Sequence, residues 1–239
     1  MAQVAVSNDQ WGVRYTDARL IGGLSELNIE NDAMNKIAHC MNYGCFIGNL
    51  TGSIYGGYAG RAEGVAVLET AYHLMGLTIY QANFQQSFPF HLHFTSNSGR
   101  EMLWLISVTH QAVSRNSRIL STSNGFLNAG SGTEMVLYEA AAHGLTSTVS
   151  GGHLWETAVA RNKTRNYATP LEARLACEVG HSVARQGMTR TQANEIVNRL
   201  LAEYEENIAT APQGKMFQEC YDLKTAQPTS WYEDMFGEV

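Results

Sequence analysis

Residues 118–140, RILSTSNGFLNAGSGTEMVLYEA, contain a strand candidate, a glycine-rich turn and a helix start in immediate succession. The strand candidate is Arg118–Ser123, and the glycine-rich turn follows it directly. Ser131 and Glu134 then have the spacing of a capping box, in which the two side chains satisfy free backbone N–H groups at the start of a helix. The stretch therefore predicts a β-strand followed by an α-helix.

The same order of elements occurs twice more upstream. Residues 46–55 form a strand candidate before GGYAG at 56–60, and an apolar stripe with helical spacing covers 61–77. Residues 88–94 alternate Phe or Leu with Pro or His, as a strand with two distinct faces does, and a further capping box follows at 98–101. Three strand–loop–helix units indicate α-helices packed around a parallel sheet.

The C-terminal third is predicted to be helical. Capping boxes at Thr169-x-x-Glu172 and Thr189-x-x-Gln192 predict consecutive helices from Thr169 to about Thr210. A (β/α)8 barrel needs eight strands and roughly 250 residues, whereas about three or four strand–helix units are visible here. We therefore expect residues 1–239 to form a single α/β domain. Its sheet is either open and doubly wound or the C-terminal portion of a TIM-type barrel whose first strands lie elsewhere.

Composition narrows the class of protein. The 239 residues contain 16 Lys and Arg against 22 Asp and Glu, a formal net charge of -6, so nucleic acid is not the expected partner. No apolar run reaches about 18 residues, so no membrane span is expected. The N-terminal residues lack the basic start and apolar core of a signal peptide, and the expected location is the cytoplasm. Four scattered cysteines do not suggest a disulfide framework.

Parallel α/β folds carry their reactive groups on the loops that follow the carboxyl ends of the strands. Those loops lie at 50–60, 95–101 and 123–134. Their polar candidates are Tyr58, Asn97, Arg100, Glu101, Asn124, Asn128 and Glu134. For Glu101 and Glu134, helix capping is favoured over catalysis.

His91 and His93 are two residues apart on a predicted strand and could bind a metal from one face. The favoured alternative is a polar strand face satisfied by its neighbours, since no carboxylate partner is evident, and no metal site is expected. GGYAG at 56–60 lacks the GK[ST] ending of a phosphate-binding loop. The residues alone thus indicate an α/β domain with a loop-built site.

Four segments resemble one known family. They are IYGGYAG at 54–60, TSNSGREML at 95–103, TEMVLYEA at 133–140 and APQGKMFQECYDLKTAQPT at 211–229. Each is similar to the C-terminal half of the archaeal-type monomethylamine:corrinoid methyltransferases. The resemblance implies the downstream half of a (β/α)8 barrel, with its C-terminal helices.

The resemblance also implies an activity. Members of that family move a methyl group from monomethylamine to the Co(I) of a corrinoid carried by a separate partner protein, and hold no tightly bound cofactor of their own. Their distinctive residue, pyrrolysine, would precede Met1 by a few positions, so we expect these 239 residues to be the downstream part of a larger gene. On this reading Tyr58, His91, Arg100 and Glu101 are expected to bind substrate.

The family surrounds its pyrrolysine with a glutamate, a glutamine and a tyrosine, and the corresponding positions here are Leu50, Asn124 and Phe126. Asn124 keeps the amide and Phe126 keeps the ring, but Leu50 can neither stabilise an ammonium ion nor take its proton. Two alternatives to methylamine transfer follow. The chain could be a paralogue that acts on another, larger or quaternary methyl donor, or a non-catalytic chain that docks the corrinoid protein.

A half-barrel would expose unpaired edge strands and an apolar sheet face, which drive association. We therefore expect the 239-residue chain to pair with the missing N-terminal half or to form a homo-oligomer.

Overall fold

The structure is a computed structural model of the chain and describes residues 14, 16–23, 27–160 and 165–238. Its helices are α2 (Asn31–Asn42), α3 (Ala62–Thr78), α4 (Arg100–Asn116), α5 (Glu134–Val149), α6 (Pro170–Gln186), α7 (Arg190–Tyr204), the 3-10 helix η3 (Glu205–Thr210), α8 (Phe217–Cys220) and α9 (Ser230–Glu238). Its strands are β1 (Arg19–Gly23), β2 (Ile47–Thr51), β3 (Ile54–Tyr55), β4 (Phe84–Ser87), β5 (Phe90–His91), β6 (Ser121–Leu127), β7 (His153–Val159), β8 (Tyr221–Asp222) and β9 (Gln227–Pro228).

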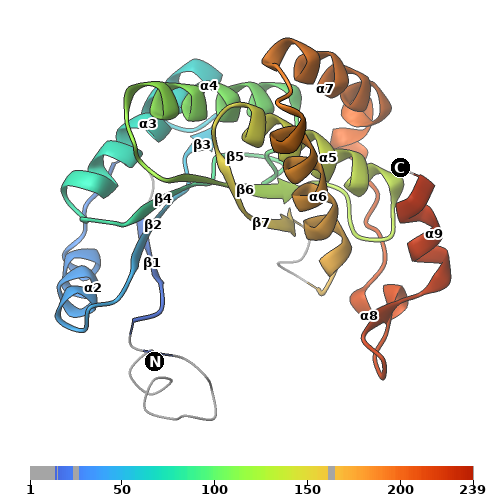
Figure 1. The fold of residues 1–239 in the computed structure, drawn as a ribbon, viewed down its shortest axis with the longest axis horizontal. Coiled ribbons are helices and arrows are strands. Elements are labelled where there is room, and N and C mark those ends of the chain that lie inside the picture. The colour runs from blue at the N-terminus through green and yellow to red at the C-terminus, as the bar shows by residue number, and fades with distance from the viewer. Residues whose placement is uncertain (1–13, 15, 24–26, 161–164, 239) are drawn as a thin grey trace.

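The central sheet has five strands in the order β1-β2-β4-β6-β7, and every neighbouring pair is parallel. Strand order therefore follows chain order, with a helix in each connection. Since right-handed crossovers put such helices on one side of a sheet, α3, α4 and α5 cover the convex face of an arch (Figure 1). The α/β architecture and the parallel sheet confirm the prediction. A doubly wound sheet would reverse its strand order, whereas this sheet keeps the chain order throughout, which is consistent with part of a barrel.

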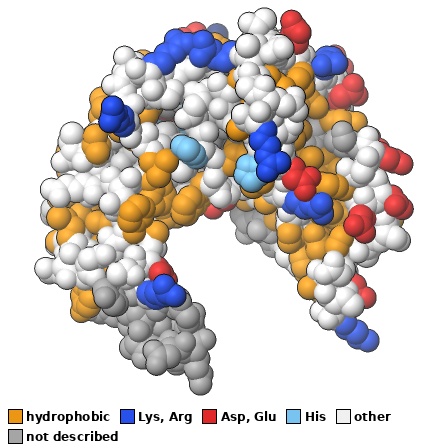
Figure 2. All heavy atoms as spheres, viewed as in Figure 1, with side chains coloured by type: hydrophobic (Ala, Val, Ile, Leu, Met, Phe, Trp, Pro, Cys, Tyr) orange, Lys and Arg blue, Asp and Glu red, His pale blue; other side chains and the backbone are white. Residues whose placement is uncertain are grey.

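The arch leaves the other face of the sheet open. Figure 2 shows a hollow beneath the arch, with hydrophobic side chains along its wall. The N-terminal part of the described chain forms one side of this hollow, and α8 and α9 lie on the other (Figure 1). We call the side that faces this hollow the concave face. Among the described helices, none is both long and apolar enough to cross a membrane.

All three strand predictions were wrong in their boundaries. The strand expected at Arg118–Ser123 is β6 at Ser121–Leu127, so the residues expected in the following turn belong partly to the strand. The predicted strand 46–55 is two strands, because the chain leaves the main sheet after Thr51 and pairs Ile54 and Tyr55 with β5. The predicted strand 88–94 is also wrong: β4 ends at Ser87, and β5 covers only two residues. Pro89 lies between the two strands, and proline has no N–H to contribute to a ladder of hydrogen bonds.

Strand β4 was not predicted from the sequence, because three of its four residues, FQQS, are polar although all four are buried. Gln85 is paired by a neighbour, because its Oε1 accepts a hydrogen bond from Asn49 Nδ2 at 2.9 Å. Such pairing allows amides to occupy a sheet interior. The hydrophobic pattern that marks most strands was therefore absent.

Two of the four predicted capping boxes are confirmed. Thr169 caps α6 with Glu172, and Thr189 caps α7 with Gln192. In both cases the helix start is settled locally, by residues three positions apart. The predicted consecutive helices end, as expected, near Thr210.

The other two capping boxes are wrong, because tertiary partners take their side chains. Ser98 Oγ donates to the Glu139 carboxylate, and α4 starts after Gly99 without a side-chain cap. Ser131 Oγ donates to the Lys215 carbonyl at 2.9 Å, and Thr133 caps α5 instead.

The C-terminal segment anchors the loop that follows β6. The Gly130 amide donates to the Pro212 carbonyl at 3.0 Å, and the Lys215 amide donates to the Ser131 carbonyl at 2.8 Å. A Cβ at Gly130 would lie 1.8 Å from the Gln213 carbonyl oxygen, so only glycine permits this approach. Residues 212–215 of the C-terminal segment thus pack against the loop that follows β6.

Candidate functional site

The concave face carries the three residues that the sequence singled out as a pocket. Asn49 Nδ2 donates to the Tyr72 carbonyl of α3 at 3.2 Å, so Asn49 points toward the helices. Because side chains alternate along a strand, Leu50 points to the concave face. Ser123 contacts His143 of α5, and by the same alternation Asn124 and its second neighbour Phe126 point to the concave face.

Strand β7 adds two side chains to that face through a β-bulge. Ser123 pairs with Leu154 and Asn124 with Glu156, so Trp155 is an extra residue without a partner on β6. A bulge turns consecutive side chains to the same side. Trp155 accordingly stacks on Phe84, with ring centroids 4.8 Å apart, while Glu156 contacts Asn124.

A row of polar side chains crosses three strands at this level. Gln86 Nε2 donates to Asn124 Oδ1, and Asn124 Nδ2 donates to Glu156 Oε1 at 2.8 Å. Since a carboxylate can only accept, both amides must be oriented with their N–H groups toward β7. We call Gln86, Asn124 and Glu156 the polar row.

Both ends of the polar row retain acceptors. Gln86 is 1% exposed, and its Oε1 has no hydrogen-bond donor in the described part of the chain. At the other end, burial raises the pKa of the Glu156 carboxyl. The three ion pairs found among the described residues do not include Glu156. Within the described residues, the ends of the polar row therefore have neither a further hydrogen-bond donor nor a positively charged partner.

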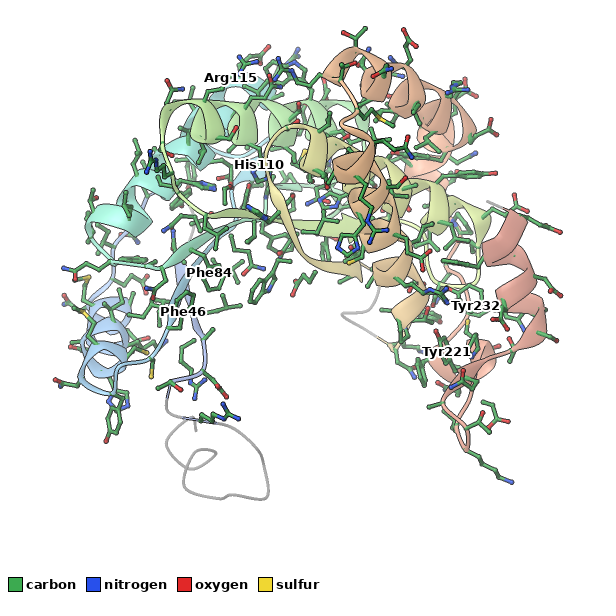
Figure 3. The ribbon with its side chains drawn as sticks, in the orientation of Figure 1. Phe46, Phe84, His110, Arg115, Tyr221 and Tyr232 are labelled. Carbon is green, nitrogen blue, oxygen red and sulfur yellow. The ribbon has the colours of Figure 1, made fainter. Side chains whose placement is uncertain are left out.

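Aromatic side chains border the row on the concave face. Phe126 packs edge-on against Phe88 with centroids 5.1 Å apart. Phe46 stacks on Phe84 at 5.9 Å, and both lie on the inner side of the arch (Figure 3). Phe46 and Trp155 remain 46% and 44% exposed, which is unusual for rings of this size on a sheet face.

Asn97 fixes the strand that presents Asn124 and Phe126. Its Nδ2 donates to the Asn124 carbonyl at 2.7 Å, and its Oδ1 accepts from the Phe126 amide at 2.7 Å. Asn97 is fully buried. This predicted candidate therefore positions the site rather than facing the hollow.

Three of the four residues expected to bind substrate lie in a separate cavity. His91, Arg100 and Glu101 line a space of about 420 Å³ beside the N-terminus of α4. Arg100 is engaged there with Glu205, with Nη2 to Oε2 at 2.7 Å, and Glu101 accepts from the Tyr55 hydroxyl. Tyr58 is 93% exposed and does not line this cavity.

The premise of the histidine metal site is wrong. His91 ends β5, and the chain turns before His93, whose backbone amide donates to His91 Nδ1 at 3.1 Å. Burial, with a smaller contribution from His93, lowers the pKa of His91. The described residues contain no group of three or more His, Cys, Asp or Glu side chains placed to hold a metal.

Two buried glutamates, missed from the sequence, hold the loops at the carboxyl edge of the sheet. Glu69 of α3 accepts from the Ser53 amide at 3.1 Å. Glu139 of α5 accepts from the Asn128 and Ala129 amides, each at 2.9 Å. Burial raises the pKa of Glu69 to about 7. These carboxylates shape the loops and do not reach the concave face.

Each of these glutamates precedes a buried histidine by four residues, in ETAYH at 69–73 and EAAAH at 139–143. His73 Nε2 lies 2.7 Å from Ser121 Oγ, and His143 Nε2 lies 3.0 Å from Ser123 Oγ. His110 of α4 shares Ser121 at 2.9 Å and lies between α4 and the sheet (Figure 3). The repeated E-x-x-x-H spacing was the available sequence signal, because it puts both side chains on one helix face.

Comparison with known proteins places this geometry in one family. The family description that matches residues 1–239 is monomethylamine methyltransferase MtmB. The MtmB2 protein of Methanosarcina acetivorans is 35% identical over 226 residues, 94% of this chain and 49% of that protein. The MtmB protein of Methanosarcina mazei is 35% identical over 237 residues, 98% of this chain and 51% of that protein.

The fold agrees with the sequence match. The crystal structure of the Methanosarcina barkeri monomethylamine methyltransferase superposes with a TM-score of 0.91 at 34% identity, over 99% of this chain and 52% of that one. A structure described as the hydroxylamine complex of MtmB matches equally well. The chain spans about half the length of the relatives it matches. On this evidence the chain belongs to the monomethylamine methyltransferase MtmB family.

Proposed function

We propose that this chain is part of an enzyme that moves a methyl group from monomethylamine to the Co(I) corrinoid of a cytoplasmic partner protein. Its family membership supports the reaction class. The observation that carries the proposal is the polar row on the concave face, bordered by Phe126 and Leu50. Acceptors set in an apolar wall suit a small amine, whose N–H groups need acceptors and whose methyl group needs an apolar contact.

In this proposal the residues of the chain bind and orient the amine. Leu50 and Phe126 contact its methyl group, while the polar row accepts its N–H groups. The corrinoid is a co-substrate brought by the partner protein, and the chain itself holds no tightly bound cofactor. The partner would dock at the carboxyl edge of the sheet, where the C-terminal segment supports the loop after β6.

We also propose that further barrel strands cover the concave face in the complete protein. The five-stranded sheet follows barrel order but ends in the unpaired edges of β1 and β7 within the described residues. Phe46 and Trp155 are about half exposed on the open face. Burying these rings against additional strands would be favourable at about 25 cal/mol per Å². The same surface would support self-association if those strands were absent.

The test is a methyl-transfer assay on the full-length protein produced from its native locus. The protein is mixed with its corrinoid partner in the Co(I) state and with methylamine. Conversion of the Co(I) absorption spectrum to that of methyl-Co(III), dependent on methylamine, is expected. A spectrum that stays unchanged with a partner shown to be methylated by another route would contradict the proposal.

Leu50 favours a second candidate, transfer from another methyl donor. An aliphatic side chain tolerates a larger or quaternary amine that needs no proton removed. The same assay with dimethylamine, trimethylamine and tetramethylammonium distinguishes the two candidates. Faster methylation from a quaternary donor than from methylamine would favour this alternative.

A further inference from the structure

We infer that Glu156 is the residue that binds the ammonium nitrogen of the substrate and so selects cationic amines. This inference rests on the proposed function, because it concerns the same concave site. The resemblance to known methyltransferases led us to expect the pocket carboxylate at the position of Leu50, on β2. In this chain a carboxylate instead lies on β7, in contact with Asn124.

The β-bulge is what brings Glu156 into the site. In a regular strand without the bulge, alternation from Leu154 would turn residue 156 toward the helices. Leu154 packs toward α6, where a Cβ on Gly180 would lie 2.9 Å from its Cδ1. Bulges are common beside functional sites because they re-aim a side chain in this way.

The polar row orients the carboxylate and leaves it able to accept. Asn124 Nδ2 donates to Oε1 of Glu156, and Gln86 holds Asn124 through the opposite side of the same amide. This leaves Glu156 Oε2, on a solvent-exposed side chain, without a hydrogen-bond donor from the described residues. The ligand that fits is a donor with positive charge, because charge-assisted hydrogen bonds to carboxylates are the strong ones.

A second observation indicates the same kind of ligand. Gln86 Oε1 is a buried acceptor without a donor, at the end of the row beside Leu50. Buried carbonyl oxygens are rarely left unpaired. Both N–H groups used within the row point toward β7. The row therefore ends in acceptor oxygens, at Gln86 on one side and at Glu156 on the other. At the Glu156 end, which lies two strands away from Gln86, a small ammonium ion supplies the missing donor.

The experiment compares the full-length wild-type protein with Glu156→Gln. Binding of methylammonium chloride is measured by titration calorimetry without the corrinoid partner, and KM and kcat for methylamine are measured with it. The substitution keeps the shape and removes the charge. Dissociation constant and KM should rise at least about tenfold, because a hydrogen bond to a charged group contributes more than a neutral one.

Two further variants make the result specific. Glu233→Gln removes a carboxylate on α9 that makes no contact with the polar row, and it should leave binding within about twofold of wild type. Glu156→Asp keeps the charge and should retain part of the affinity that Glu156→Gln loses. Equal loss in Glu156→Asp and Glu156→Gln would overturn the inference, because charge would then not be what matters.

The two proposals can fail separately. If methylammonium binding depends on Glu156 but no methyl group reaches the corrinoid, the inference holds and the proposed function fails. If methyl transfer proceeds and Glu156→Gln leaves both KM and the dissociation constant unchanged, the proposed function holds and the inference is wrong.

Discussion

The two faces of the central sheet differ in what covers them, although each has a buried amide oxygen without a partner among the described residues, Asn49 Oδ1 on the convex side and Gln86 Oε1 on the concave side. On the convex face, Ser121 and Ser123 are hydrogen-bonded by buried histidines from α3, α4 and α5, and Asn49 and Gln85 bond each other. On the concave face, Gln86 Oε1 lacks a donor in the described residues and Phe46 is 46% exposed. The chain completes the convex face with its own helices. The concave face has no such cover within the described residues.

The largest expected effect of this difference is association of the isolated 239-residue chain. Its exposed concave face should produce oligomers or aggregates by sedimentation velocity at micromolar concentration. Trp155→Ser, which removes an apolar ring from that face, should reduce the assembled fraction. Val67→Ser removes an exposed apolar side chain from α3 and is the matched control. A wild-type chain that stays a compact monomer at all concentrations would contradict the prediction that the exposed concave face drives association.

The buried histidines on the convex face should make the free energy of unfolding strongly pH-dependent. Burial lowers the pKa of His73 and His143 to about 4 and of His110 to about 3. The unfolded chain therefore binds more protons than the folded chain between about pH 6.5 and pH 4, and stability falls as pH falls through that window. Burial also raises the pKa of the Glu69, Glu156 and Glu172 carboxyls, which opposes this effect, for Glu69 between about pH 4.5 and 7. We expect the three histidines to outweigh these carboxyls.

The expected loss is several kcal/mol between pH 6.5 and 4.5, about 1.4 kcal/mol for each proton and pH unit. Urea unfolding at fixed protein concentration measures it. His110→Phe should weaken the pH dependence, whereas His181→Asn, at an exposed position on α6, should leave it unchanged. Equal pH slopes in the wild type and His110→Phe would contradict the assignment.

Glu139→Ala should destabilise the chain by about 3 kcal/mol. It strands the buried amides of Asn128 and Ala129, and each unsatisfied group costs about 1–3 kcal/mol. Glu134→Ala, in the first turn of the same helix but exposed, should cost about 0.5 kcal/mol through the helix dipole. Urea midpoints of the two variants measure the difference, and similar losses would contradict a special role for Glu139.

The smallest effect is expected for Trp155→Ala in the isolated chain, below about 1 kcal/mol. The ring stacks on Phe84 but remains 44% exposed, so little buried area is lost. In the full-length protein, where we propose that further strands cover this ring, the cost should rise to about 3 kcal/mol or more. Equal costs in the two proteins would show that the concave face stays open.

Local sequence signals predicted what depends on local contacts. The capping boxes at Thr169 and Thr189 were correct because both partners lie within one helical turn. The similar pattern at Ser98 misled, since Glu139, 41 positions away, takes the serine hydroxyl. Spacing along the chain cannot tell these cases apart, because the deciding partner is distant in sequence.

The candidate site shows the same division. Asn124 could be proposed from the sequence as a residue of the loop after a predicted strand, and Phe126 could be proposed through the family resemblance. Glu156 could not, because its inward orientation depends on a bulge between β6 and β7. A register shift of one residue reverses which face a side chain occupies, and no periodicity within HLWETAV reveals it.

The sequence by itself determined that this chain is α/β, that its C-terminal third is helical, and which family it belongs to. The first two follow from residue types at fixed spacing, and the family follows from the four segments that resemble it. Only the tertiary structure decided which polar residues are buried partners and which face the hollow. Gln85 and Gln86 are adjacent, yet one satisfies Asn49 on the convex side and the other holds Asn124 on the concave side. Pleating of the strand separates them, and the surroundings of each face determine what each amide does.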